Sequence, residues 1–380
     1  MSPTAGPLAG IRVVELGGIG PTPFAGMMLA ELGADVVRVD RPGETNPLAL
    51  AGGLRRSRPS IAVDLKAEAG RRVVQRLADD ADVLVEGYRP GVVERLGLGP
   101  DECLGRNPRL VHARMTGWGQ TGPWAQRAGH DITYAAVSGT LHALGTAERP
   151  VAPVPVIGDF AGGSLYLVVG VLAALIARGS TGRGQVVDAA MVDGAAHLFS
   201  MVHGLLGAGG WRDEREANLL DGGAPFYAVY ECADGRFVAV GALEPPFWAE
   251  LVAALGVEVD GEQYDTATWP AQRARFTAAF RTRSRDEWAE HFEGIDACVA
   301  PVLSLTEAPR HPHLVGRGTF APDAHGHPVP RTGPRLSDTP PLAPGREPVP
   351  GADTTSYLLA HGFSEAEVTE LVASGAVVQA

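Results

Sequence analysis

The strongest constraint on the fold is an alternation of short apolar runs with helical patterns over the first 120 residues. Strand-like runs cover residues 11–16, 35–40, 60–65, 82–86 and 110–115. Helical patterns at 24–32, 67–78 and 92–96 lie between them. Strands that alternate with helices in this way predict a parallel sheet with helices on both faces. We therefore expect an α/β fold.

The first strand–helix–strand unit resembles those of dinucleotide-binding folds, because Asp40 follows the glycines of its loop by about twenty residues. The loop itself, Gly17–Pro23, does not fit the Gly-x-Gly-x-x-Gly pattern. Pro21 and Pro23 also lack the N–H groups that would hold a pyrophosphate. We expect no nicotinamide or flavin cofactor.

Two polar segments interrupt apolar surroundings in the middle of the chain: one carries His130, and the other carries Asp159. The apolar run 164–176 that follows Asp159 is shorter than the ~18 residues of a membrane span, so it predicts a buried core helix. A carboxylate at a helix start is favoured by the helix dipole and the free N–H groups. Asp159 is therefore either a functional carboxylate or a plain N-cap. His130 is likewise either a functional imidazole or a structural residue at a helix start.

The second half of the chain has a different pattern. A hairpin is predicted at 226–231 and 236–240, followed by helices near 269–281 and 285–292 and a strand at 297–303. Residues 332–351 are rich in proline, and the last helix has Ser364 as its cap with Glu367 three residues on. We predict a large domain over 1–205, a linker over 206–224, a small α+β domain over 225–330, and a proline-rich linker with a return to the large domain over 331–380.

Composition narrows the classes of partner. With hydrophobic residues at 45%, charged residues at 20% and a net charge of −12 over 380 residues, the chain is typical of a soluble globular protein and not of a nucleic-acid binder. The first residues show neither a basic start nor an apolar run, so we expect no leader, no membrane anchor and a cytoplasmic location. Three cysteines without ligand spacing argue against a disulfide framework or a metal site.

An anionic ligand needs a local group of cations in so acidic a chain. The first hundred residues hold such a group, which we expect to bind an anion: Arg38, Arg41, Arg55, Arg56, Arg58, Lys66, Arg71, Arg72, Arg89 and Arg95.

Several segments in the same order resemble the family III coenzyme A transferases and, within that superfamily, its branch of α-methylacyl-CoA racemases. The segments that carry the resemblance are 8–16, 32–42, 64–66, 86–91, 116–123 and 181–188, with 362–377 at the end of the chain. Together they cover nearly the whole chain.

The resemblance implies a Rossmann-like large domain built from both chain ends, a smaller α+β domain and an interlocked homodimer. It also implies an acyl-CoA thioester substrate, with CoA as part of the substrate and no separate cofactor. The positions that match the coenzyme-binding segments of the family are Arg41, Val63, Asp64, Leu65, Lys66, Gly87, Tyr88, Arg89, Arg95 and Gly129.

The resemblance to the racemases further implies a catalytic set of His130, Asp159 and Glu244. Inversion of a carbon α to a thioester needs a proton acceptor on one face and a proton donor on the other. His130, oriented by Glu244, would serve one face and Asp159 the other, and the glycine-rich backbone around Asp159 would supply a donor to the enolate oxygen. The expected role is in lipid metabolism.

Two alternatives remain open from the sequence. In a CoA transferase, Asp159 would instead attack the thioester and carry the acyl group as an anhydride. The other alternative is an acyl-CoA-binding protein without catalysis. The helix after Asp159 contains no methionine before Met191, unlike the acyl path of many racemases, so the sequence does not identify the acyl chain.

Overall fold

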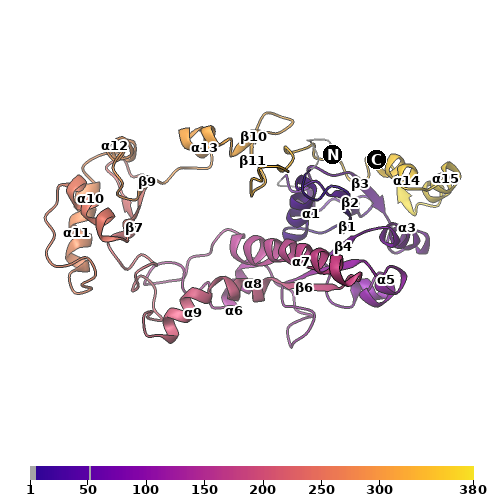
Figure 1. Ribbon diagram of the computed structural model, residues 1–380, viewed down its shortest axis with the longest axis horizontal. Helices are drawn as coiled ribbons and strands as arrows, with labels where there is room; N and C mark the ends of the chain where they lie inside the picture. The colour runs from indigo at the N-terminus through magenta and orange to yellow at the C-terminus, as the bar shows by residue number, and fades with distance from the viewer. Residues whose placement is uncertain (1–5, 51–52) are drawn as a thin grey trace. The chain divides into compact units, whose positions relative to one another are not determined.

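The computed structural model describes residues 6–50 and 53–380 of the chain (Figure 1). Residues 1–5, on which part of the expectation about a leader depends, lie outside the described residues. The chain divides into two compact units. The first contains Met1–Ser138, Pro153–Leu198 and Gly316–Ala380, and the second contains Gly139–Ala152 and Phe199–Val315.

The first unit is built on a seven-stranded sheet with the order β12-β3-β2-β1-β4-β5-β6. Every neighbouring pair is parallel except β12 with β3, which is antiparallel. The strands are β1 (Arg12–Leu16), β2 (Asp35–Asp40), β3 (Ser60–Val63), β4 (Val83–Glu86), β5 (Val111–Thr116), β6 (Val186–Ala190) and β12 (Val377–Val378). The predicted parallel sheet is therefore confirmed, and most strand ends lie within one or two residues of their predicted positions.

Helices cover both faces of this sheet, as predicted. On one face, side chains of α1 (Pro21–Glu31) and α7 (Tyr166–Thr181) pack on the strands. On the other face lie α3 (Glu68–Asp79), α4 (Val92–Arg95), α5 (Pro100–Arg106), α14 (Thr354–Ala360) and α15 (Glu365–Ala373). Helix α5 was not predicted, although Pro100 at its first turn is a helix-start signal. Figure 1 shows α14 and α15, in yellow, beside α3, which the Arg76–Glu367 ion pair joins to α15.

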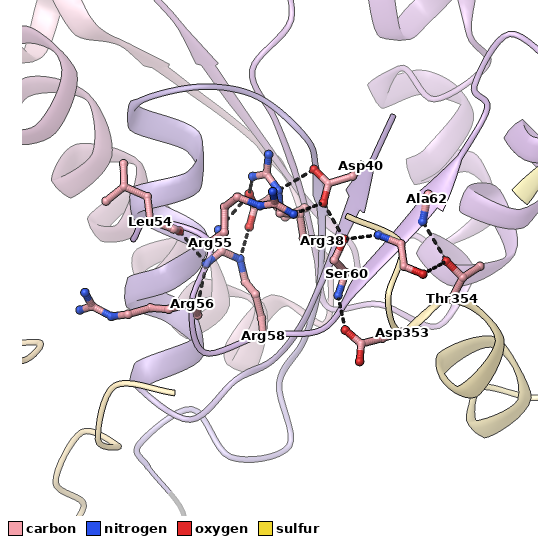
Figure 2. Close-up of polar contacts among 12 residues, drawn as sticks. Arg38, Asp40, Leu54, Arg55, Arg56, Arg58, Ser60, Ala62, Asp353 and Thr354 are labelled. Atoms are coloured by element: carbon pink, nitrogen blue, oxygen red, sulfur yellow. Dashed lines mark hydrogen bonds and ion pairs between the residues drawn. The ribbon is translucent and has the colours of Figure 1, made fainter. Parts of the chain in front are cut away.

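Several arginines of the predicted anion-binding group are buried and paired with carboxylates. Arg38 is 1% exposed and pairs with Glu15 and Asp40, at 2.5 and 2.8 Å. Arg58 pairs with Glu15 at 2.7 Å, and Arg55 pairs with Asp40 at 3.0 Å. Figure 2 shows these arginines and Asp40 directed toward one another. The prediction that they bind an anionic ligand is wrong, because buried carboxylates already neutralise them.

Arg56 differs from the prediction in the same way, since it pairs with the buried Glu31 at 2.6 Å. The C-terminal segment closes this region: the N–H of Ser60 donates to Asp353, and the N–H of Ala62 donates to the hydroxyl of Thr354 (Figure 2). These hydrogen bonds join strand β3 to the C-terminal segment beside the buried charges.

The apolar helix after Asp159 is longer and more exposed than predicted. A π-helical segment η1 (Val156–Leu165) runs directly into α7, so that one helix spans Val156–Thr181. The glycines of η1 do not end the helix but allow close packing. A Cβ on Gly194 of α8 (Met191–Leu198) would lie 1.9 Å from the carbonyl oxygen of Gly162.

This 26-residue helix is long and apolar enough, by length and composition only, to cross a membrane, with a mean hydropathy of 2.2 over its most apolar window. Its sheet-facing side is buried, including Leu167 and Val171, whereas Val169 is 64% and Ile176 is 78% exposed. The prediction of a buried core helix is therefore wrong for one face. Core helices of soluble proteins pass the same test, so the length alone does not place the helix in a membrane.

The second unit contains an antiparallel sheet of order β7-β8-β9. The predicted hairpin is confirmed, with Tyr227 opposite Gly241 and Glu231 opposite Phe237. Aromatic residues of the helices pack on this sheet around Phe226, Phe280 and Trp288. The elements are α9 (Ser200–Gly207), β7 (Tyr227–Glu231), β8 (Phe237–Gly241), α10 (Pro245–Leu255), α11 (Trp269–Phe280), α12 (Arg285–His291), β9 (Val299–Pro301) and η2 (Ala308–Arg310).

Three segments fall on a different side of the division than the predicted domain limits placed them. Residues 199–205 belong to the second unit and not to the first. Residues 139–152 belong to the second unit, where Arg215 donates to the carbonyl oxygens of His142 and Thr146. The hairpin of β10 (Phe320–Pro322) and β11 (Pro328–Pro330) belongs to the first unit, where Arg56 donates to the carbonyl oxygen of Pro330. Helix α13 (Pro312–Arg317) lies at the division. The remaining short helices are α2 (Pro47–Leu50) and α6 (Asp131–Val137), both in the first unit.

Candidate active site

A cavity of ≈ 760 Å³ lies within the first unit, at the carboxyl ends of strands β1, β4 and β5. The loops that follow these strands contribute residues 19–22, 87–90 and 116–118 to its lining. Since β2 lies on one side of β1 and β4 on the other, the strand order reverses at this point. Ligands of open α/β sheets bind at such a crevice. The volume is within the range of small-molecule sites.

Asp159 lines this cavity from the first turn of η1. Its backbone is held against the start of α1, because the hydroxyl of Ser164 lies 3.0 Å from the carbonyl oxygen of Asp159 and 2.8 Å from that of Pro21. Gly20 leaves room for the carboxylate: a Cβ there would lie 3.2 Å from Asp159 Oδ2, and the φ of Gly20 is +62°. Burial and the negative charge of Asp131 raise the pKa of Asp159 to about 6, and the charge of His130 opposes this rise.

His130 lines the same cavity as the residue that caps helix α6. Its backbone is fixed by Thr133, whose hydroxyl accepts from the N–H of His130 at 3.0 Å and lies 2.7 Å from its carbonyl oxygen. The imidazole is exposed. A fixed backbone and an open side chain leave the imidazole available to a ligand.

Asp131, which the sequence analysis did not single out, connects these two segments. Its Oδ2 accepts from the N–H of Gly158 at 2.6 Å and from the N–H of Asp159 at 2.8 Å. Both N–H groups were candidates to stabilise an enolate oxygen. These two N–H groups are not free for that role, because a buried carboxylate already binds them.

Aromatic rings form another wall of the cavity. The rings of Trp118 and Tyr134 meet edge to face with centroids 4.8 Å apart, and burial followed by the charge of Asp159 raises the pKa of Tyr134 to about 12. Positions 117 and 129 require glycine, since a Cβ would lie 2.2 Å from the Tyr134 ring at Gly117 and 2.5 Å from it at Gly129. Tyr134 is therefore an uncharged, tightly packed wall at neutral pH.

Comparison with known proteins agrees with this geometry. The family model of CoA-transferase family III matches residues 8–354. The chain belongs to this family.

Curated relatives within CoA-transferase family III carry two kinds of activity in their names. The chain is 45% identical to the alpha-methylacyl-CoA racemase of Mus musculus and 43% identical to that of Homo sapiens, in each case over 96% of both chains. It is 34% identical to the succinyl-CoA–D-citramalate CoA-transferase of Chloroflexus aurantiacus, over 66% of this chain and 65% of that protein. Among solved structures, a CAIB/BAIF family protein from Brucella suis matches with a TM-score of 0.79 at 27% identity, covering 94% of this chain and 100% of that one.

The predicted coenzyme-binding residues of this family III chain divide into two groups. Gly87, Tyr88, Arg89 and Gly129 line the cavity. The others do not line it: Arg41, Lys66 and Arg95 are exposed, Asp64 and Leu65 are half-buried, and Val63 is buried in β3 opposite Val377. Val63 as a whole is 1% exposed, so it offers a ligand almost no surface in this unit.

Arg127 is a further cation at the cavity that the sequence analysis missed. It lines the cavity with its guanidinium 4.3 Å from the centre of the Trp124 ring. Gln126 donates to the carbonyl oxygen of Pro90 at 3.0 Å, which ties the segment of Arg127 to the loop of Arg89. Neither arginine pairs with an acid among residues 6–50 and 53–380. No sequence motif marked Arg127, because its place at the cavity depends on a loop.

Glu244 belongs to the second unit, where it is exposed and directly precedes α10. Its charge, after burial and Asp296, contributes to a raised pKa of the Cys298 thiol. Of the predicted catalytic set, the cavity therefore contains His130 and Asp159.

Proposed function

We propose that this chain is an α-methylacyl-CoA racemase, which inverts the α-carbon of a 2-methylacyl-CoA thioester by deprotonation and reprotonation through an enolate. The observation that carries the proposal is that His130 and Asp159 line one cavity in a chain that is 43–45% identical, over 96% of its length, to two proteins named racemases. Two acid–base groups at one cavity suit two-face proton transfer better than acyl transfer, which needs Asp159 alone.

In the proposed mechanism, Asp159 serves one face of the α-carbon and His130 the other. With one epimer, ionised Asp159 removes the α-proton and protonated His130 returns a proton to the opposite face. With the other epimer the roles reverse. A pKa of about 6 suits this exchange, since Asp159 is accessible in both protonation states near neutral pH. Glu244 is proposed to orient the imidazole and to stabilise its protonated form.

The enolate oxygen needs a donor other than the N–H groups of Gly158 and Asp159, which are bound to Asp131. A group elsewhere in the cavity wall has to serve this role.

The coenzyme portion is proposed to bind at the carboxyl edge of the sheet, with its phosphates held by arginine. Arg89 and Arg127 at the cavity carry unneutralised charge that suits phosphate. The exposed Arg41, Lys66 and Arg95 are proposed to contact parts of CoA outside the cavity. The other proposed coenzyme-binding residues are Val63, Asp64, Leu65, Gly87, Tyr88 and Gly129. No cofactor or metal beyond the substrate's own CoA is proposed.

The chain is further proposed to act in lipid metabolism as a cytoplasmic, interlocked homodimer that binds neither membrane nor nucleic acid, with a large domain made from both chain ends. Support for the dimer comes from the uncovered face of α7, with Val169 and Ile176, beside the edge strand β6, where Val186 is 41% exposed. A second copy would bury this face. Sedimentation should show a dimer that does not dissociate on dilution, and a reversible monomer at micromolar protein would contradict the interlocked form.

The test of the activity is solvent-deuterium uptake at the α-carbon of each epimer of a 2-methylacyl-CoA. His130→Ala should slow exchange from one epimer by about 10²–10⁴-fold and leave residual exchange from the other, and Asp159→Ala should show the opposite bias. Acyl exchange between CoA and an added free acid, without α-deuteration of any 2-methyl thioester, would support the transferase alternative and refute the racemase.

A further inference from the structure

The proposed mechanism gives Asp131 no role, yet its carboxylate has an unusual environment. Its side chain is 4% exposed, in the first turn of α6 and at the wall of the cavity. Oδ2 accepts two N–H groups, whereas Oδ1 is buried without a hydrogen-bond partner in the described part of the chain. No arginine or lysine pairs with it there. A buried and unpaired carboxylate is costly, so its presence at this cavity calls for a physical reason.

The two accepted N–H groups belong to the segment that carries Asp159. Gly158 has to approach closely, since a Cβ there would lie 3.1 Å from Asp131 Oδ2. The two hydrogen bonds therefore fix both the position of the Asp159 backbone and its separation from the Asp131 charge.

The charged and titratable groups that face Asp159 come from few elements. From α6 and its cap these are His130, Asp131 and Tyr134. Arg89, in the loop after β4, acts on Tyr134. The start of α1 contributes no titratable side chain to the cavity, only residues 20–22. Asp131 is therefore the negative charge that opposes ionisation of Asp159, and His130 is the positive charge that favours it.

We propose that Asp131 is a positioning residue that holds the Asp159 backbone in place through its two hydrogen bonds and sets its buried carboxylate against the Asp159 side chain. The role rests on the proposed function, because it matters most if Asp159 has to donate as well as accept a proton. An aspartate with an ordinary pKa near ~3.9 would be almost fully ionised at neutral pH and a poor donor. Burial of Asp159, with the charge of Asp131 added to it, would thus keep part of Asp159 protonated for the donor half of the reaction.

The decisive variant is Asp131→Asn. An asparagine can place its amide oxygen where Oδ2 now accepts two N–H groups and its NH₂ where Oδ1 now lies, so it removes the charge and keeps the backbone contacts. The carboxyl carbon of Asp159, assigned with Asp159→Asn, is followed by ¹³C NMR during a pH titration. Its midpoint should move from about 6 in the wild type to a clearly lower pH in Asp131→Asn. An unchanged midpoint in a folded variant would overturn the proposal.

A kinetic readout separates this role from a structural one. For the epimer whose turnover needs protonated Asp159, the pH at which kcat falls should move down in Asp131→Asn. A uniform loss of kcat at every pH, without a shifted profile, would show that Asp131 only supports the fold. Asp193→Asn is the matched control, because Asp193 is exposed on α8 and its charge acts on Asp188. It should leave the Asp159 midpoint unchanged.

A wild-type measurement covers the case in which Asp131→Asn does not fold. The carboxyl carbon of Asp159 should titrate with a midpoint near 6 in the wild type, and a midpoint near the ordinary ~3.9 would refute the proposal. These titrations do not require turnover. A protein that exchanges no α-proton but shows the shifted Asp159 midpoint would refute the racemase reading and leave the role of Asp131 standing.

Discussion

Two charged regions lie close to strand β1 of the same sheet, and they differ in how their charges are compensated. At the β1–β3 side, Glu15 is fully buried and its carboxylate binds both Arg38 and Arg58. At the carboxyl ends of β1, β4 and β5, Arg89 and Arg127 have no acidic partner among the described residues. Asp159, in the same cavity, faces one like charge and one opposite charge.

The difference separates structural charges from functional ones. A buried charge without a partner costs several kcal/mol, so the network around Glu15 persists only because each group is paired and hydrogen-bonded. The cavity tolerates the uncompensated charges of Arg89 and Arg127 because both side chains are exposed to water. Counting arginines in the sequence could not make this distinction, since both regions draw them from the first 130 residues.

The largest expected effect comes from breaking the paired region. Arg38→Met should lower the free energy of unfolding by about 3–5 kcal/mol, because it leaves Glu15 and Asp40 with one cation less in a buried site. Urea denaturation followed by circular dichroism measures this loss. Arg72→Ala is the control, since Arg72 forms an exposed pair with Glu68 and should change stability by no more than about 0.5 kcal/mol. Equal losses of unfolding free energy in the two variants would contradict the distinction between buried and exposed charge pairs.

The second prediction concerns the stability cost of Asp159. Its folded-state pKa of about 6 is above the unfolded value near ~3.9, so the folded state binds the proton more tightly and loses stability as pH rises from about 4 to 6. Asp159→Asn should therefore be more stable than the wild type above pH 6. The gain should be below ~3 kcal/mol because the side chain is partly exposed. It should shrink toward pH 4. Thermal unfolding of both proteins between pH 4 and pH 8 measures the difference. A variant that is less stable than the wild type at pH 8 would contradict the prediction.

The smallest expected effect comes from the unpaired arginines. Arg89→Ala and Arg127→Ala should each weaken binding of a CoA thioester by about 1 kcal/mol, or roughly five- to tenfold, with a larger effect at low salt. Neither change should lower stability measurably, since neither guanidinium pairs with an acid in the described residues. Isothermal calorimetry gives the affinity, and Arg71→Ala is a control whose arginine does not line the cavity. Unchanged affinity in both variants would place the phosphates elsewhere.

Local pattern was sufficient for much of the fold. Alternating apolar runs predicted the parallel strands, and Ser364 with Glu367 predicted the capping box that begins α15. These features depend on residues close together in the chain, which is why periodicity and capping chemistry reveal them. The length of the helix after Asp159 was missed because glycines normally weaken helices, whereas here tertiary packing against Gly194 keeps them helical.

The sequence by itself determined the sheet and the family, and it named His130 and Asp159 from motifs of a few adjacent residues. The tertiary structure alone decided which charges are available. It placed Arg38, Arg55, Arg56 and Arg58 in buried pairs, brought Arg127 to the cavity, and set Asp131 against the backbone of Asp159. The physical reason is that burial and the distance between charges determine whether a group ionises or binds, and both depend on contacts between residues far apart in the chain.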